Sequence, residues 1–224
     1  MKSSLVHGVV AAGLLASVAA GARADEPLQN DILGARVNTV YGPSGLITVP
    51  DAYVNAKGRA TIGTFFSKDS SVSANQGVFQ NIDLGVAFLD RDGQKSKVLA
   101  NAKLNLVPSN FKGFQIGVGV TDIANSIKSS TYGIVSFQTQ LPSGLEGRYV
   151  GLRVHAGYGS GIYREKIIGG AELLVDNRTS LIGEWNGTKL NGAARYILAE
   201  NLRAQAGVNN KEFFLGFHFG LAGR

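Results

Sequence analysis

Residues 114–121 read FQIGVGVT, and every second residue of this stretch is large and apolar. The apolar positions are Phe114, Ile116, Val118 and Val120. The positions between them are Gln115, Gly117, Gly119 and Thr121. Because successive side chains of a β-strand point to opposite faces, this period of two predicts a strand with one apolar face.

The same alternation recurs from about residue 59 to residue 220. It predicts strands over 59–66, 82–88, 98–106, 114–121, 131–140, 150–158, 166–175, 180–186, 190–198, 202–209 and 212–220, and we place a twelfth within 35–49. Short turns such as Asn186-Gly187 separate these stretches, and such turns join antiparallel neighbours. We therefore predict an all-β chain that forms one antiparallel up-and-down transmembrane β-barrel of 10–12 strands.

The composition agrees with a sheet protein. Only 17% of the 224 residues are charged, against about 25% in ordinary soluble domains, and 30 are glycine. The sequence contains no cysteine, which excludes disulfides, thiolate metal sites and a lipid anchor on an N-terminal cysteine. With two histidines after the leader, a zinc site is not expected, and we predict neither a metal nor a cofactor.

The N-terminus has the pattern of a secretory signal peptide. Lys2 precedes the apolar stretch 5–21, and Ala22-Arg23-Ala24 is a small-residue cleavage site. We assign residues 1–24 to the signal peptide, 25–50 to a lead-in or cap, and 51–224 to the barrel. Cleavage lowers the formal net charge from +6 to +4, which does not favour nucleic acid as a partner.

A membrane location is favoured by what the two faces of the strands carry. The less apolar face is rich in glycine, with scattered charges of both signs, which suits the interior of a small barrel. Aromatic residues near the strand ends suggest the girdle of a membrane barrel: Tyr158, Tyr163, Trp185, Tyr196 and Phe219. We expect export through the Sec pathway to the bacterial outer membrane; a soluble periplasmic ligand-binding barrel is the alternative.

The last predicted strand, EFFLGFHFG at 212–220, resembles the aromatic C-terminal strand of outer-membrane proteins. The barrel assembly machinery recognises that strand, so the resemblance implies this machinery and outer-membrane lipid as partners. Five further residues, Gly220 to Arg224, follow the last aromatic residue here.

The stretch GLITVPDAYVNAKGRATIG, residues 45–63, resembles the start of the YjbH-like barrel domains of the outer membrane. The matching positions are Gly45, Leu46, Ile47, Pro50, Gly58 and Gly63. Weaker similarities extend the resemblance over most of 44–220. It implies a role in secreting exopolysaccharide or organising it at the surface, with polysaccharide export proteins as partners.

Charged and histidine residues predicted on the inward face are the candidate functional set. They are Asp83, Lys103, Arg153, His155, Glu172, Glu184, Arg195, Arg203 and His218. In an open lumen they would set the selectivity of a narrow conduit; in a filled one they would neutralise each other.

We also considered a barrel enzyme acting on lipid or lipopolysaccharide. Ser160 follows His155 by five residues, and Glu172 or Glu184 would supply the carboxylate of a hydrolytic triad. No local signature of such an enzyme is present, and we predict that the chain is not an enzyme.

Overall fold

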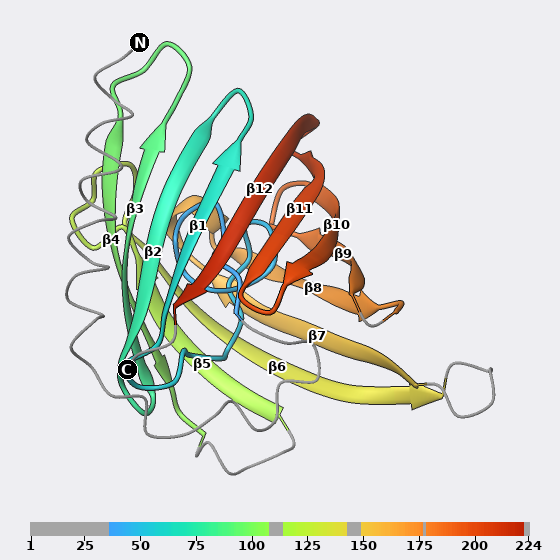
Figure 1. Ribbon diagram of the computed structural model, residues 1–224. Helices are drawn as coiled ribbons and strands as arrows, with labels where there is room; N and C mark the ends of the chain where they lie inside the picture. Colours follow the sequence, from blue (N-terminus) through green and yellow to red (C-terminus); the bar gives the residue numbers. More distant parts are fainter. Residues whose placement is uncertain (1–35, 108–113, 143–148, 177, 222–224) are drawn as a thin grey trace.

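The computed structural model describes residues 36–107, 114–142, 149–176 and 178–221, and it shows a closed β-barrel (Figure 1). Each strand pairs antiparallel with the next, and the last strand closes the barrel against the first. The strands are β1 Ala60–Phe66, β2 Ser70–Phe79, β3 Ile82–Asp90, β4 Lys97–Asn105, β5 Phe114–Thr121, β6 Ser130–Pro142, β7 Tyr149–Gly159, β8 Lys166–Leu174, β9 Thr179–Trp185, β10 Leu190–Ala199, β11 Leu202–Asn209 and β12 Glu212–Leu221, with a 3₁₀ turn, η1, at Gly161–Tyr163. The predicted up-and-down barrel is confirmed.

The position predicted for the twelfth strand is wrong. It is β2, at 70–79, and not a segment within 35–49. Its sequence, SSVSANQGVF, has one large apolar residue, Val72, before its last two positions, so it lacks the apolar alternation that identifies the other strands. Backbone pairing with β1 and β3 on both sides holds it in the sheet instead.

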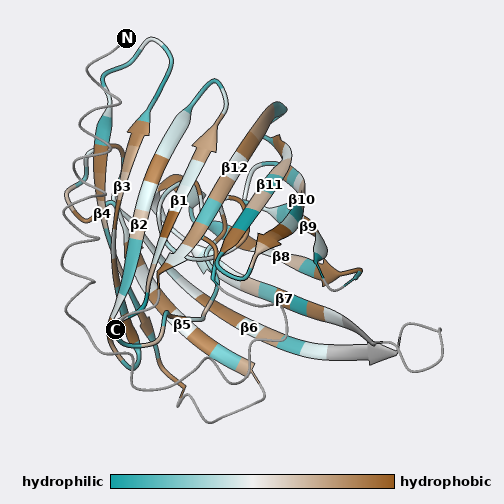
Figure 2. Cartoon of the chain, in the orientation of Figure 1, coloured by the Kyte–Doolittle hydropathy of each residue, from teal (hydrophilic) through white to brown (hydrophobic). Residues whose placement is uncertain are grey.

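The outer surface of the barrel is apolar, as an outer-membrane-type β-barrel requires. Figure 2 shows apolar residues recurring along the strands, and on β12 the side chains of Phe213 and Phe217 are 69% and 37% exposed. None of the helical structure among the described residues has the length and hydropathy needed to cross a membrane.

The prediction that Tyr163 belongs to an outward-facing aromatic girdle is wrong. Tyr158, Trp185, Tyr196 and Phe219 are exposed, but Tyr163 is only 2% exposed. It lies in η1, a turn that folds inward, and its hydroxyl donates to the carbonyl of Thr48 at 3.2 Å. A residue in a turn does not follow the alternation of a strand, so spacing alone could not predict its direction.

Residues 36–55, which we call the lumen segment, run through the interior of the barrel (blue in Figure 1). All of them are buried except the half-buried Tyr41. One apolar cluster packs Leu46 and Ile47 against strand residues such as Phe65. A second packs Val49 and Ala52 against Tyr132, Ile134, Tyr163 and Ile168. The barrel therefore has a core, which forms between inward side chains of the strands and the lumen segment.

Gly117 of β5 lies at a point of close approach between the barrel wall and the lumen segment. A Cβ at this position would lie 2.7 Å from the Cα of Ala52, a backbone atom that cannot rotate away. We expect Gly117→Ala to lower the free energy of unfolding by about 1–3 kcal/mol, the range typical of overpacked cores. Urea unfolding in detergent micelles would measure this change.

The neighbouring strand supplies the matched control. A Cβ at Gly133 of β6 would meet nothing within 4 Å, so Gly133→Ala should leave stability unchanged or slightly higher. Equal effects of the two substitutions would mean that contact with the lumen segment does not constrain β5.

Candidate functional site

The GLITVP stretch forms a tight turn inside the barrel. The amide of Leu46 donates to the carbonyl of Val49 at 2.9 Å, and Gly45 pairs with Pro50 as an isolated β-bridge. A Cβ at residue 45 would lie 2.2 Å from the carbonyl oxygen of Val49, so the turn requires glycine there. The turn leaves the amides of residues 47–49 without partners in the segment itself.

Glu184 of β9 accepts those amides. Its carboxylate receives the N–H groups of Ile47, Thr48 and Val49 at 2.8, 2.9 and 3.1 Å. The Thr48 hydroxyl and the side-chain amide of Asn191 donate to it as well, the latter at 2.8 Å. A carboxylate that is 1% exposed is costly unless such donors replace water. Glu184 is thus the main anchor of the turn.

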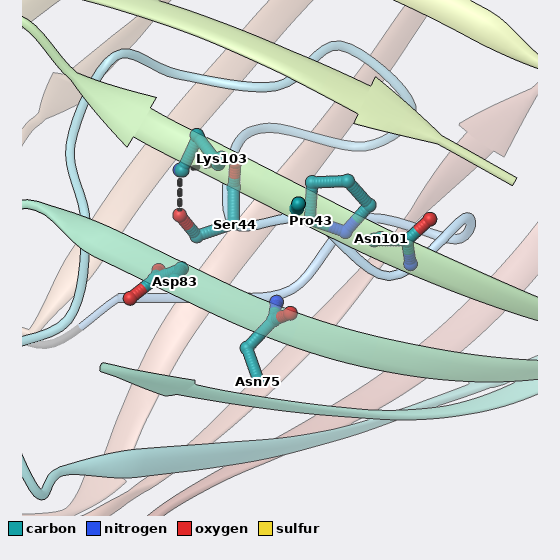
Figure 3. A pocket seen from close by; sticks show the side chains of 7 residues that line it. Pro43, Ser44, Asn75, Asp83, Asn101 and Lys103 are labelled. Atoms are coloured by element: carbon teal, nitrogen blue, oxygen red, sulfur yellow. Dashed lines mark hydrogen bonds between the residues drawn. The ribbon is translucent and has the colours of Figure 1, made fainter. Parts of the chain in front are cut away.

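Asp51 makes the second anchor, through Lys103 of β4. The ammonium of Lys103 lies 2.8 Å from a carboxylate oxygen of Asp51, and the guanidinium of Arg36 lies 4.0 Å from the other. Lys103 also donates to the Ser44 hydroxyl, as Figure 3 shows. These charges neutralise each other between the wall and the lumen segment.

The Asp51 carboxyl has a shifted pKa. Burial by itself raises it, but the positive charges of Lys103 and Arg36 outweigh burial and hold the pKa of Asp51 well below its usual range. The folded state therefore binds this proton less readily than the unfolded chain, whose aspartate pKa is about 3.9. The stabilisation from Asp51 is complete above about pH 4 and is lost as the pH falls toward the folded pKa.

We expect acid to destabilise the barrel partly through this group. Between about pH 4 and pH 2 the unsubstituted protein should lose stability more steeply than Asp51→Asn, which has no carboxyl to protonate. Urea midpoints measured at pH 7, 4, 3 and 2 compare the two. Identical acid dependence in both proteins would contradict the role assigned to Asp51.

A third group of charges joins β7, β8 and β10. One guanidinium nitrogen of Arg195 lies 2.7 Å from Glu172, and Arg153 lies 3.7 Å from the other oxygen of the same carboxylate. Arg195 also reaches the carbonyls of Gly45 and Leu46, at 3.5 and 3.4 Å. It therefore connects the wall charges to the turn held by Glu184.

His155 pairs with a serine that the sequence did not single out. Its Nδ1 lies 2.7 Å from the hydroxyl of Ser136 on β6, directly opposite in the strand register. The Ser136 oxygen also accepts the amide of Ala52 at 2.9 Å, so this hydroxyl joins His155 to the lumen segment. Ser160 instead bonds Thr131, at 2.9 Å, so the Ser160–His155 arrangement considered from the sequence is not formed.

Two further candidates lie on β11 and β12. Arg203 and His218 are partners in its register and are 4% and 1% exposed. The His218 ring lies 5.3 Å from the ring of Phe65. All nine sequence-predicted residues are buried. The lumen segment is bonded by Asp83, Lys103 and Glu184; Arg153, Glu172 and Arg195 pair with each other; and His155 bonds Ser136. They do not surround an open passage, because the lumen segment occupies the interior.

Sequence reasoning missed the residues that complete this network. The main ones are Arg36, Asn38, Asp51, Asn55, Asn75, Asn101 and Ser136, all buried. Asn101 and Ser136 occupy inward positions of predicted strands, so alternation was a usable signal for them. Asn75 lies on β2, which has no such alternation, and the residues at 36–55 belong to a segment with no regular period. Within the described chain, no group of three His, Asp or Glu side chains is placed to hold a metal.

A small cavity remains between the lumen segment and strands β2–β4 (Figure 3). It is lined by Pro43, Ser44, Asn75, Asp83, Asn101, Ala102 and Lys103, and the space between these side chains is too narrow for a water molecule. Asp83 is already bonded there by the backbone amide of Asn55, at 2.8 Å. The cavity is a packing gap, too small for a ligand.

Comparison with known proteins adds little to this picture. No family model matches the sequence, and no curated protein sequence matches it. One solved structure that is similar is the N-terminal β-barrel domain of Pseudomonas aeruginosa OprF, with 9% sequence identity. The match covers 73% of this chain and 96% of that chain, with a TM-score of 0.23. The barrel fold therefore rests on the strand pairing described above.

Proposed function

We propose that the chain is a bacterial outer-membrane protein whose barrel is filled by its own N-terminal segment, and that it serves envelope polysaccharide secretion or surface organisation as a membrane-anchored structural component. The apolar outer surface supports the membrane location. The resemblance of residues 45–63 to the YjbH-like barrels supports the polysaccharide role. Outer-membrane lipid, the barrel assembly machinery and polysaccharide export proteins are the partners that this proposal implies.

The main support for a structural role is the way Glu184 binds the GLITVP turn inside the barrel. Three successive backbone amides of the turn have this buried carboxylate as their acceptor. Opening a conduit would break these bonds together with the Asp51–Lys103 pair, and would expose the apolar clusters of the interior. The filled interior therefore favours a closed barrel over the narrow conduit that the sequence left open.

Membrane location and closure are tested on the same purified protein. We expect the protein in the outer-membrane fraction, and we expect its migration on a gel to change on heating. In planar bilayers it should give no stepwise conductance. A protein that is freely soluble in the periplasmic fraction would overturn the membrane location. Regular conductance steps would overturn the closed barrel while leaving that location intact.

The polysaccharide role needs a separate test in cells. Deleting the gene should reduce or delocalise surface polysaccharide, and restoring the unsubstituted protein should reverse the change. A deletion strain with normal amount and distribution of polysaccharide would remove this part of the proposal.

A further inference from the structure

The lumen segment enters and leaves the barrel at the same end. The side-chain amide of Asn38 donates to the carbonyl of Thr61 at 3.1 Å, and the side-chain oxygen of Asn55 accepts the Thr61 hydroxyl at 3.0 Å. Thr61 is the second residue of β1, so both contacts lie at the end where β1 begins, which we call the entry end. Between them the segment reaches the opposite, far end, where the carbonyl of Thr48 accepts the hydroxyl of Tyr163 in the turn between β7 and β8. The segment is therefore a loop inserted from the entry end, and it does not thread through the barrel.

This loop is held together by its own backbone. The amide of Val40 donates to the carbonyl of Ile47 at 2.9 Å, and the amide of Gly45 donates to the carbonyl of Val37 at 2.8 Å. Within the described chain, no backbone–backbone hydrogen bond joins the lumen segment to a strand, and its contacts to the wall are made by side chains. Every strand is paired on both sides without it. The lumen segment can therefore leave without breaking the pairing that forms the wall.

The inward side chains of the wall are sorted along the barrel axis. Toward the far end lie six buried side chains that we call the apolar collar: Phe65, Leu89, Leu99, Tyr132, Ile168 and Phe214. The tip of the lumen segment, Leu46 to Val49, belongs to the same two apolar clusters. Toward the entry end lie the charged side chains Asp83, Lys103, Arg153, Glu172, Arg195 and Arg203, whereas Glu184 binds the tip. The wall therefore has one end that the tip seals and one end that is hydrophilic.

Much of the charge in the hydrophilic half is paired within the wall itself. Glu172 lies 2.7 Å from Arg195 and 3.7 Å from Arg153, and it accepts the hydroxyl of Ser180 at 2.7 Å. These groups keep one another as partners when the lumen segment leaves. Water can replace the remaining contacts there, since polar groups are costly only when nothing hydrogen-bonds them. The emptied half is thus suited to hold water.

We propose that the lumen segment is an autoinhibitory plug, and that its withdrawal through the entry end turns the barrel into a channel for ions and small hydrophilic solutes. The apolar collar is the gate, because a hydrophobic constriction conducts only when it is wetted. In the hydrophilic half four cations face two carboxylates, and withdrawal takes Asp51 away from Lys103, so the open channel favours anions. This channel goes beyond the closed resting barrel proposed above, and it rests on the proposed membrane location.

Conductance of the full chain in planar bilayers tests the plug. Leu46→Ser with Ile47→Ser removes the apolar contacts of the tip and leaves every wall charge in place. The open fraction should rise at least about tenfold over that of the unsubstituted protein, because burial of each such side chain favours the seated state by roughly tenfold or more. The matched control, Ile123→Ser with Val175→Ser, changes two exposed apolar residues of turns and should leave the open fraction within about twofold. In a gradient of KCl, the reversal potential of the open channel should lie on the chloride side.

The direction of withdrawal has its own measurement. Thr48→Cys is added to the double serine variant, and a polymer-linked maleimide too large to cross the barrel is applied to one chamber. Glu200→Cys and Lys95→Cys, exposed in turns at the entry end and the far end, show which chamber faces each end. Reaction from the entry chamber should hold the channel open, because the modified tip cannot return. The same reagent in the far chamber should have no effect.

A double serine variant that migrates as a heat-modifiable barrel but conducts no more than its control would overturn the plug. Locking from the far chamber would overturn the path of withdrawal, and a reversal potential at zero or on the potassium side would overturn the anion preference. Steady conductance by the unsubstituted protein would instead defeat the closed resting barrel, and migration that does not change on heating would defeat the membrane location. If the double variant forms no barrel, the single Leu46→Ser and Ile47→Ser variants replace it, each with an open fraction raised at least about fivefold.

Discussion

Replacing Glu184 by alanine is expected to lower the free energy of unfolding by about 3–6 kcal/mol. The substitution leaves three buried backbone N–H groups, those of residues 47–49, without their acceptor. Each buried donor left unsatisfied costs about 1–3 kcal/mol. It also removes the anchor that holds the turn against β9, so the lumen segment should become more accessible even where the barrel stays closed.

Two measurements follow these effects separately. Urea unfolding in micelles, read from the fluorescence of the single tryptophan, Trp185, reports stability. Because the chain has no cysteine, Thr48→Cys provides a unique maleimide target inside the barrel. Labelling of the single Thr48→Cys variant should be slow. Adding Glu184→Ala should make it at least about tenfold faster, because a loss of 1.4 kcal/mol in the free energy that holds the lumen segment in place already raises the accessible fraction tenfold.

Glu200 supplies the control for this substitution. It is an exposed glutamate in the β10–β11 turn, and Glu200→Ala should change stability by no more than about 0.5 kcal/mol. If Glu184→Ala behaves like Glu200→Ala in both measurements, the carboxylate does not hold the lumen segment.

Lys103→Met is expected to cost about 3–5 kcal/mol. It removes the ammonium that lies 2.8 Å from Asp51 and leaves a buried carboxylate with Arg36 at 4.0 Å as its remaining salt-bridge partner among the described residues. Breaking a buried ion pair on one side has a cost of this size because the remaining charge is still out of water.

A double-mutant cycle isolates the pair. Asp51→Asn removes the stranded charge, so the double variant should be more stable than the sum of the two single losses by at least about 2 kcal/mol. Lys68→Met, which breaks the exposed pair with Asp92, should cost less than about 1 kcal/mol. Strict additivity in the cycle would mean that Lys103 and Asp51 do not stabilise each other.

Much of the barrel wall was predictable from local pattern. Eleven strands were located to within a few residues because their outward side chains are mostly large and apolar and their inward ones are mostly polar or small, which gives the sequence a period of two. β2 was not predicted because Val72 is the one large apolar residue among its outward positions 70, 72, 74 and 76. Backbone pairing on both sides holds it in the sheet without an apolar pattern. Tyr163 was misassigned because a turn between strands has no period at all.

For the candidate site residues, the sequence predicted the direction of the side chain but not its partner. Alternation was enough to put Asp83, Lys103, Glu172 and Glu184 on the inward face, but not to name their partners. Lys103 pairs with a residue 52 positions away, and Glu184 with residues 135–137 positions away. Nothing in the local pattern of 36–55 distinguishes a cap from a core.

The sequence by itself determined an all-β chain with an apolar and a polar face, since those depend on the medium that each successive side chain meets. Only the tertiary structure decided that the barrel is filled. The closed sheet has an interior lined with buried charges and glycines. The lumen segment fills it by bringing backbone amides to Glu184, a carboxylate to Lys103, and apolar side chains to the spaces between them. Such complementarity exists only between residues that the fold brings together.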